Sequence, residues 1–377
     1  MPRGGWRYIA QRLTGDGSTG DFLDFDVPIS GVGITDNLSG HNALTGTIKP
    51  EFGRMLADDG SLLLEEYGTA IWAENGGEIR GGGILTHSDF DGPEWKLETT
   101  GFTGYAEGMP YTDSTFFVEA DPLDIYRHVW EHLQGKPGGD LGLEVSTLKT
   151  GLKVGVELEQ GEFDTQSGPL SFESGPVKLT WYQTHDLGDF LTKLASDTPF
   201  DWHERHWWDG DVIRHKVDLG YPRIGRRRDD LRFVIGENVS VSPSIAVAGE
   251  DYASEVLALG SGEGAAMVKG HSSRPTRRLR RVAVVADSSL LTAAATNSLA
   301  EREIAWRAIT DSISGITCID HPHARVGSVN VGDEIFIEGR IGWRTLETYA
   351  RVTSISITPD QGNVMQLAVT RSDRLVA

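Results

Sequence analysis

The sequence has little of several features that mark common protein classes. Among its 377 residues Cys318 is the only cysteine, which excludes an internal disulfide and a cysteine-rich metal site. No stretch approaches the roughly 20 apolar residues of a membrane span, and the first residues lead into no apolar run of a secretion signal. We therefore expect a soluble product of a cytoplasm, with Cys318 as a small buried apolar residue.

Basic residues are also in deficit. Lys and Arg number 35 and Asp and Glu 55, giving a formal net charge of −20. Residues 1–220 hold 16 basic and 37 acidic side chains, whereas residues 221–377 hold 19 and 18, so the excess negative charge lies in the first part. Because affinity for phosphates comes from Lys and Arg, nucleic-acid binding across the chain is disfavoured.

Glycine is abundant, and it indicates a chain rich in short strands. It accounts for 46 of the 377 residues, about 12% against a usual value of roughly 7%. Asn75-Gly76 and Asp91-Gly92-Pro93 are turn signals. After the second turn, Glu94–Thr100 alternates apolar and charged residues as a half-buried strand does.

Three segments favour helices. Residues 121–135 and 186–199 each begin with an Asp at the N-cap, continue with an apolar stripe at helical spacing and end at a helix stop. A third helix is expected from a cap at Asp287 to about Ile309. Strand patterns resume in the tail of the chain.

Residues 200–219 predict a β-hairpin with Asp209-Gly210 as its turn. In that register Trp208 faces Asp211 and His206 faces Ile213, while Glu204 faces His215 as a cross-strand pair. One face of the hairpin then collects apolar residues: Phe200, Trp202, Ile213, Val217 and Leu219.

Several histidines invite a metal interpretation. Asp124, His128 and His132 follow one another at i, i+4 and i+8, so they share a helix face and form a zinc-like ligand set. The H-E-x-x-H pattern is absent, however, and a solvated helix face is the favoured interpretation.

The other histidines are less promising. His203 and His206 are three apart on a strand and point to opposite faces, so with His215 they do not converge on one ion. His321-Pro322-His323 is interpreted as a turn. We therefore predict no metal, cofactor or catalytic residue.

Motifs of nucleotide-binding and hydrolytic enzymes are missing or out of place. Gly260-x-Gly262-x-x-Ala265 matches the dinucleotide fingerprint formally, but Glu263 puts a negative charge where the pyrophosphate would lie, so a structural glycine turn is favoured. No G-x-S-x-G elbow is present. With 55 acidic residues, spacing cannot single out a glycosidase pair.

Two further groups need an explanation. Trp207 and Trp208 near the hairpin tip could stack on sugar rings, although packing, with Trp207 opposite Val212, is the favoured interpretation. Two arginine runs lack the aromatic residues of a nucleic-acid motif, and we expect them to meet acidic surface on a neighbouring subunit. The runs are Arg223, Arg226, Arg227, Arg228 and Arg232, and Arg274, Arg277, Arg278, Arg280 and Arg281.

Several segments together resemble the tail-tip or baseplate hub proteins of long-tailed bacteriophages, often called minor tail proteins. The resemblance extends over nearly the whole chain in order and spacing. The segments that carry it are Leu97–Tyr105, Arg232–Val239, Val256–Gly264, Val331–Ile335 and Tyr349–Ile357.

The resemblance implies an α+β, mainly β fold with two tail-tube-like antiparallel β-barrels and inserted α/β segments. The first barrel would comprise residues 1–111, followed by an α/β insertion at 112–199. The second barrel would be built from 200–235 and 316–377 around an inserted α/β segment at 236–315.

The implied function is that of a structural virion protein at the tail tip, not an enzyme. Such hubs form a homotrimeric ring that joins the distal tail protein to tip or receptor-binding proteins and surrounds the end of the tape-measure protein. DNA passes through the ring without specific binding, which suits the acidic residues 1–220. Longer relatives carry an appended cell-wall hydrolase, for which no room remains before Ala377.

Two other functions stay open at this point. The first is a carbohydrate-binding module for host surface polysaccharide, using the tryptophan-rich hairpin. The second is a peptidoglycan hydrolase with Asp124, His128 and His132 as its metal site.

Overall fold

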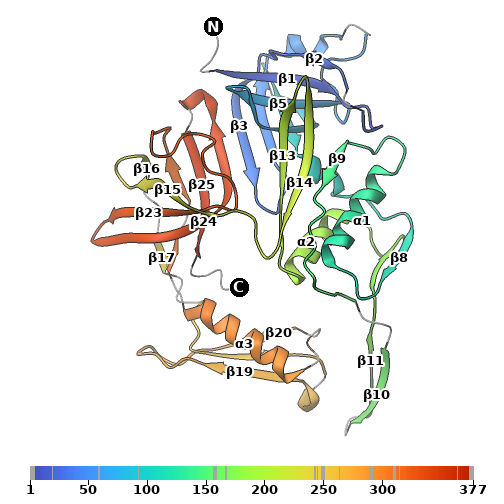
Figure 1. Cartoon of the computed structure of the whole chain (residues 1–377), viewed down its shortest axis with the longest axis vertical. Coiled ribbons are helices and arrows are strands. Elements are labelled where there is room, and N and C mark those ends of the chain that lie inside the picture. Colours follow the sequence, from blue (N-terminus) through green and yellow to red (C-terminus); the bar gives the residue numbers. More distant parts are fainter. Residues whose placement is uncertain are drawn as a thin grey trace. The chain divides into compact units, whose positions relative to one another are not determined.

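The computed structural model describes residues 5–18, 20–57, 60–91, 93–155, 159–165, 168–241, 243, 245–247, 251–262, 264–287, 290, 292–308, 311–313, 315–362 and 364–372. The chain divides into two compact units. Their helices and strands are labelled in Figure 1. Unit 1 comprises Met1–Arg226, Val326–Gly332 and Ser354–Met365. Unit 2 comprises Arg227–Arg325, Asp333–Thr353 and Gln366–Ala377. Strands dominate both units, which confirms the expected α+β, mainly β class. Closure of the sheets into barrels and the five predicted segment boundaries stay predictions.

The main sheet of unit 1 is antiparallel, in the order β3-β4-β7-β6-β5-β1-β2. Trp95, Leu97 and Thr99 of β7 are buried, as their alternation predicts. The β5–β6 turn lies one residue later than expected: Asn75 pairs with Glu78, leaving Gly76-Gly77 as the loop, both at positive φ. The elements are β1 (Trp6–Arg12), β2 (Phe22–Asp24), β3 (Ser30–Asn37), β4 (Ala43–Ile48), η1 (Pro50–Arg54), β5 (Thr69–Asn75), β6 (Glu78–Asp91) and β7 (Glu94–Thr100).

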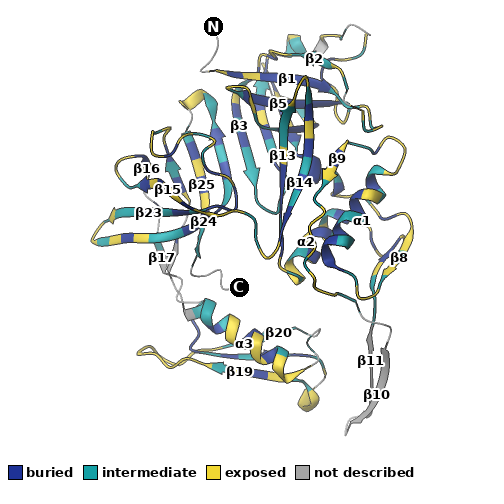
Figure 2. Ribbon diagram, in the orientation of Figure 1, coloured by how far each residue is buried: buried dark blue, intermediate teal, exposed yellow. Residues whose placement is uncertain are grey.

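Two of the predicted helices lie in unit 1, and both begin at the expected caps. The Asp121 side chain accepts a hydrogen bond from Leu123 N and begins α1 (Pro122–Gln134), which ends at Gly135. The Asp186 side chain likewise begins α2 (Leu187–Asp197). The apolar side of α1 is buried (Figure 2). It packs in one hydrophobic core with Trp72 of β5 and with Phe102, which lies just after the end of β7.

Among the described residues, the remaining elements of unit 1 are two 3₁₀ turns and seven strands in small sheets. β12 pairs with β8, and β14 pairs in parallel with β9. Their bounds are η2 (Phe102–Ala106), β8 (Ser114–Phe117), β9 (Leu143–Val145), β10 (Glu159–Thr165), β11 (Gly168–Ser174), β12 (Val177–Thr180), β13 (Asp201–Asp209), β14 (Val212–Gly220) and η4 (Pro359–Gln361).

Unit 2 contains a sheet in which β15 pairs in parallel with β23, β23 pairs antiparallel with β24, and β16 pairs antiparallel with β22. Parts of β24 and β25 belong to this unit and parts to unit 1. The bounds are β15 (Arg227–Val234), β16 (Val239–Val241), β22 (Ile316–Cys318), β23 (Glu334–Ile341), β24 (Arg344–Thr358) and β25 (Val364–Arg371).

A small α/β segment is also part of unit 2. Its sheet has the order β19-β18-β20, and α3 covers one face through Ala300 and Ile304, which pack with Val256 and Ala258. The third helix begins at Ala293, not after a cap at Asp287, because the Asp287 backbone is engaged in a turn with Leu259 and Leu290. The bounds are β17 (Ile245–Val247), β18 (Glu255–Leu259), η3 (Gly264–Ala266), β19 (Lys269–Ser273), β20 (Val282–Ala286), α3 (Ala293–Ala308) and β21 (Asp311–Ile313).

None of the helices in the described ranges is both long and apolar enough to cross a bilayer.

Candidate functional site

A buried region with several polar residues lies on the β13–β14 hairpin of unit 1. The register of this hairpin differs by two residues from the predicted one. Trp208 pairs with Ile213, His206 pairs with His215, and the loop is Gly210-Asp211. Glycine thereby takes the first loop position at φ 64°, as type II′ turns favour. Because side chains alternate with a period of two, the shift keeps every side chain on its predicted face. The predicted apolar residues Phe200, Trp202, Ile213, Val217 and Leu219 are all buried.

A carboxylate occupies the middle of this buried face. The Glu204 side chain is fully buried, and each of its oxygens accepts two hydrogen bonds. Oε1 accepts from the backbone N of Phe102 at 2.7 Å and from His206 Nε2 at 2.6 Å. Oε2 accepts from the backbone N of Thr103 at 2.8 Å and from Thr103 Oγ1 at 2.7 Å. A Cβ on Gly101 would lie 2.7 Å from Oε2, so the carboxylate needs a glycine there.

Two histidines extend the carboxylate into a hydrogen-bonded chain. His206 Nδ1 lies 2.9 Å from His215 Nδ1, and the ring of Trp72 stacks on His215 at a centroid distance of 5.1 Å. The predicted direct pair of Glu204 and His215 is therefore wrong, since Glu204 faces Val217 and reaches His215 through His206. The sequence analysis considered Glu204, His206 and His215 one by one but did not predict the hydrogen bonds that link them.

Burial and local partners set the charge states of this chain. Burial raises the pKa of the Glu204 carboxyl, but the hydrogen bond and charge of His206 and the bonds from Thr103 outweigh it and lower the pKa to about 2. Burial lowers the pKa of His215 to about 2, and the charge of His206 adds to the effect. At neutral pH Glu204 is therefore ionised and His215 is neutral.

A cleft of about 410 Å³ opens beside the hairpin, still within unit 1. His203 lies on its wall and contacts Asp36 Oδ1 through Nε2 at 2.8 Å. Burial lowers the pKa of His203, but Asp36 more than compensates and holds it above its ordinary value. His203, Glu204 and His206 are thus paired with groups of the protein itself, as in a structural polar core.

The metal candidates of α1 share a helix face but bind separate partners. Asp124 pairs with Arg127 and with Lys149, the latter at 3.1 Å. His128 Nε2 lies 2.8 Å from the hydroxyl of Tyr111. His132 Nε2 contacts Thr112. The three side chains do not gather around one point, so this zinc-like set is not formed.

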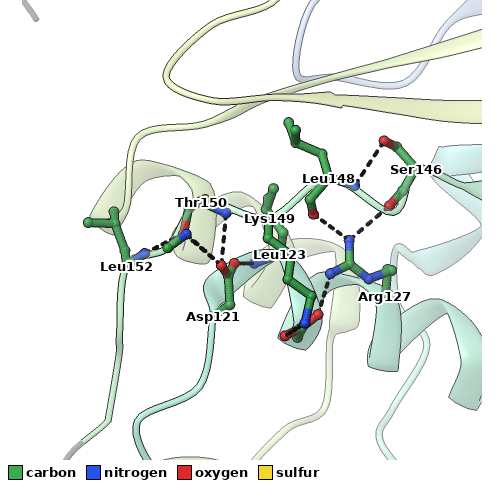
Figure 3. A network of polar contacts seen from close by, with 10 residues as sticks. Asp121, Leu123, Arg127, Ser146, Leu148, Lys149, Thr150 and Leu152 are labelled. Atoms are coloured by element: carbon green, nitrogen blue, oxygen red, sulfur yellow. Dashed lines mark hydrogen bonds and ion pairs between the residues drawn. The ribbon is translucent and has the colours of Figure 1, made fainter.

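Instead, the start of α1 fastens the loop that follows β9 (Figure 3). The Asp121 carboxylate accepts from the backbone N of Thr150 at 2.8 Å, in addition to capping the helix. Arg127 Nη1 donates to the carbonyls of Ser146 and Leu148, both at 2.8 Å. The polar residues of this end of the helix therefore have a structural role.

The tryptophans near the hairpin tip are engaged with neighbours. Trp208 Nε1 donates to Glu74 Oε2 at 3.2 Å, and its ring lies 5.5 Å from that of Phe22. Trp207 faces Arg214 across the hairpin rather than the predicted Val212, and the Arg205 guanidinium lies 5.7 Å from its ring. These contacts favour the packing interpretation over sugar stacking.

Several arginines predicted to contact a neighbouring subunit have partners within the chain. Arg228 is buried and pairs with Asp230 at 2.7 Å and with Asp333 at 3.1 Å. Arg232 pairs with Glu338. Two more arginines follow the same pattern, Arg227 with Asp229 and Arg280 with Glu255. Arg228 is thus explained by contacts inside unit 2, whereas for the exposed Arg227, Arg232 and Arg280 the contact with a neighbouring subunit stays a prediction.

Two minor expectations agree with the structure. Gly260 and Gly262 lie in the connection from β18 to β19, followed by the short 3₁₀ turn η3 and not by an α-helix that could bind a pyrophosphate. Cys318 is buried, and its burial raises the pKa of the thiol to about 12. It is therefore an unreactive core residue.

Comparison with known proteins identifies the fold. No protein-family model matches the chain, and no curated protein matches it. Solved structures do. A 43 kDa tail protein of prophage MuSo2 from Shewanella oneidensis is 14% identical, covers 98% of this chain and 99% of its own, and superposes with a TM-score of 0.59.

Two further tail proteins are similar over the same extent. One, from Neisseria meningitidis, is 14% identical, with 97% of this chain and 96% of its own covered and a TM-score of 0.57. Another, prophage tail protein gp18 from Listeria monocytogenes, is 8% identical, with 97% and 94% covered and a TM-score of 0.57. The chain therefore has the fold of phage tail proteins. This confirms, at the level of fold, the resemblance seen in the sequence.

Proposed function

We propose that this protein is a structural component of a phage tail: a homotrimeric hub at the tail tip. In this role it links the distal tail ring to the tip proteins, surrounds the end of the tape-measure protein and forms part of the channel for DNA. The observation that carries the proposal is the shared fold with prophage tail proteins over 98% of the chain.

The buried polar chain of unit 1 supports a structural role. Both oxygens of Glu204 are occupied by hydrogen bonds from Phe102, Thr103 and His206, and the carboxylate has no exposed surface. A catalytic carboxylate must reach a substrate atom, so this arrangement fits the anchoring of η2 to the hairpin better than catalysis.

The uneven distribution of charge along the sequence supports the proposed channel for DNA. The sequence up to residue 220, which lies within unit 1, has a large excess of acidic residues. Acidic surfaces repel phosphates, so a lumen with this charge would let DNA move without retention.

The test is the mass of the purified full chain by light scattering after size exclusion, with negative-stain images of the same peak. We expect a mass near three times 41.1 kDa and rings with a central hole. A monomer that stays a monomer and forms no ring with the distal tail protein of the same phage would refute the hub.

A second measurement separates the hub from the other two functions. Intrinsic tryptophan fluorescence should not change on addition of host polysaccharide, since Trp207 and Trp208 are packed against Arg205 and Phe22. Zymography on host cell walls, with and without a chelator, should show no cleared band. Saturable quenching or a cleared band lost on chelation would favour the sugar-binding or the hydrolase function instead.

A further inference from the structure

Glu237, His321 and His323 are the one group of three possible metal ligands found among the described residues. Glu237 lies between β15 and β16, and the two histidines follow β22, which is paired with β16. One ligand atom from each residue lies within 4.8 Å of the others. This cluster is in unit 2, and the sequence pattern had indicated only a turn there.

The distances suit a small cation. Glu237 Oε1 lies 3.1 Å from His323 Nδ1 and 3.9 Å from His321 Nε2. Ligands bound tetrahedrally to zinc at about 2.0–2.2 Å lie roughly 3.3–3.6 Å apart. Small side-chain rotations would therefore bring all three ligand atoms around one ion.

A buried asparagine holds the glutamate turn in place. Asn238, next to Glu237, is fully buried. Its Oδ1 accepts from the backbone N of Val234 at 2.8 Å, and its Nδ2 donates to the carbonyl of Arg232 at 2.7 Å. The carbonyl of Asn238 also accepts from the backbone N of Ile319, at 3.0 Å. The same residue thus fixes the turn with the glutamate and the segment that leads to the histidines.

The histidine turn is also closed by the backbone. The N of Ala324 donates to the carbonyl of His321 at 2.9 Å, and Pro322 restricts φ between the two histidines. The N of His323 approaches His321 Nδ1 at 3.3 Å. A metal ion bound at Nε2 of His321 requires a proton on Nδ1, which then no longer accepts from the backbone N of His323. Metal binding therefore replaces this 3.3 Å hydrogen bond with a coordination bond.

The cluster is open to solvent and carries a favourable charge. The side chains of Glu237, His321 and His323 are 45%, 26% and 48% exposed, so an ion can enter. The neighbouring cation of Arg232 is paired with Glu338. It is therefore partly neutralised and does not oppose a second positive charge strongly.

We propose that Glu237, His321 and His323 bind a divalent transition-metal ion of the zinc class. Two imidazoles and one carboxylate are ligands that zinc takes in proteins, and solvent completes the fourth position. The ion joins the β15–β16 turn to the segment after β22. This site is independent of the proposed tail function and goes beyond it.

The experiment is a titration of the tag-free, chelator-treated full chain with Co²⁺, followed by its visible absorption, and with Zn²⁺ as competitor by calorimetry. We expect one site per chain. Substituting any one ligand, in His321→Ala, His323→Ala or Glu237→Gln, weakens binding at least about tenfold. The control is His271→Ala, which removes an exposed histidine paired with Glu255 and should leave the affinity unchanged.

Thermal melting gives an independent readout. Zinc should raise the melting temperature of the wild type and not that of the double variant H321A/H323A, because only an ion bound to the folded state stabilises it. Melting in chelator shows whether each variant folds. If a variant with His323→Ala does not fold, His323→Gln takes its place. Equal zinc affinity in wild type and the double variant, or no binding by the wild type at millimolar zinc, overturns the proposal.

Discussion

The substitution Glu204→Gln tests whether the buried chain of unit 1 holds the hairpin to η2. Glutamine has nearly the same shape, so it removes the charge and leaves the volume. Its amide NH₂ cannot accept a hydrogen bond, so either the two donors of Thr103 or those of Phe102 and His206 lose their acceptor.

The expected loss of stability follows from these contacts. Each buried donor left without a partner costs about 1–3 kcal/mol, and the glutamine leaves two such donors. We therefore expect the free energy of unfolding to fall by about 2–6 kcal/mol. For a unit of this size that corresponds to a melting temperature lower by about 4–24 °C.

The assay is chemical and thermal unfolding at pH 7. It is monitored by tryptophan fluorescence, because the ring of Trp72 contacts those of His206 and His215. The matched control is Glu98→Gln on β7, where the side chain is exposed and the change should be within about 0.5 kcal/mol. If Glu204→Gln costs no more than the control, the carboxylate does not hold the hairpin and our reasoning is wrong.

Three further predictions concern stability and charge. Gly101→Ala should lower the melting temperature although its backbone tolerates alanine, because the new Cβ would clash with Glu204; a melt equal to that of the wild type would contradict the close approach. Acid should destabilise the protein in two stages: His215 is neutral in the fold and ordinarily titrates near pH 6.5, so stability falls below that pH, and ionised Glu204 adds a loss below about pH 4.5. Urea unfolding from pH 7 to 4 measures this, with a slope of up to about 1.4 kcal/mol per pH unit for His215, and His215→Phe should flatten it. Arg228→Ala should cost about 3–5 kcal/mol in unit 2, because it removes a buried cation that pairs with the buried Asp333 at 3.1 Å, whereas an unchanged urea midpoint would show that the pair contributes nothing.

Much of the secondary structure follows from local patterns. Asp121 and Asp186 cap the two predicted helices of unit 1, and the alternation in β7 identifies its buried face. Capping and alternation depend on residues within a few positions, so a single sequence carries them. The third helix start, at Asp287, was wrong because a Leu259 far along the chain engages that backbone.

Local patterns were less informative about register. The hairpin face was predicted correctly, but the pairing of Trp208 and His206 was displaced by two residues. A shift of two leaves the same side chains on the same face, so the apolar pattern cannot distinguish the two registers. The two registers differ in the turn, where Gly210 takes the first loop position, and in the cross-strand partners, such as His206 with His215.

The chemistry-bearing clusters depended on contacts between distant segments. Glu204 reaches Thr103 across 101 positions of the sequence, and Glu237 meets His323 only because β16 pairs with β22. Composition, charge asymmetry and local patterning were enough for the class of fold, the two helices of unit 1 and the face of the hairpin. Which side chains meet was settled by strand pairing, because hydrogen bonds and ion pairs act over a few ångströms of space, whatever the separation along the chain.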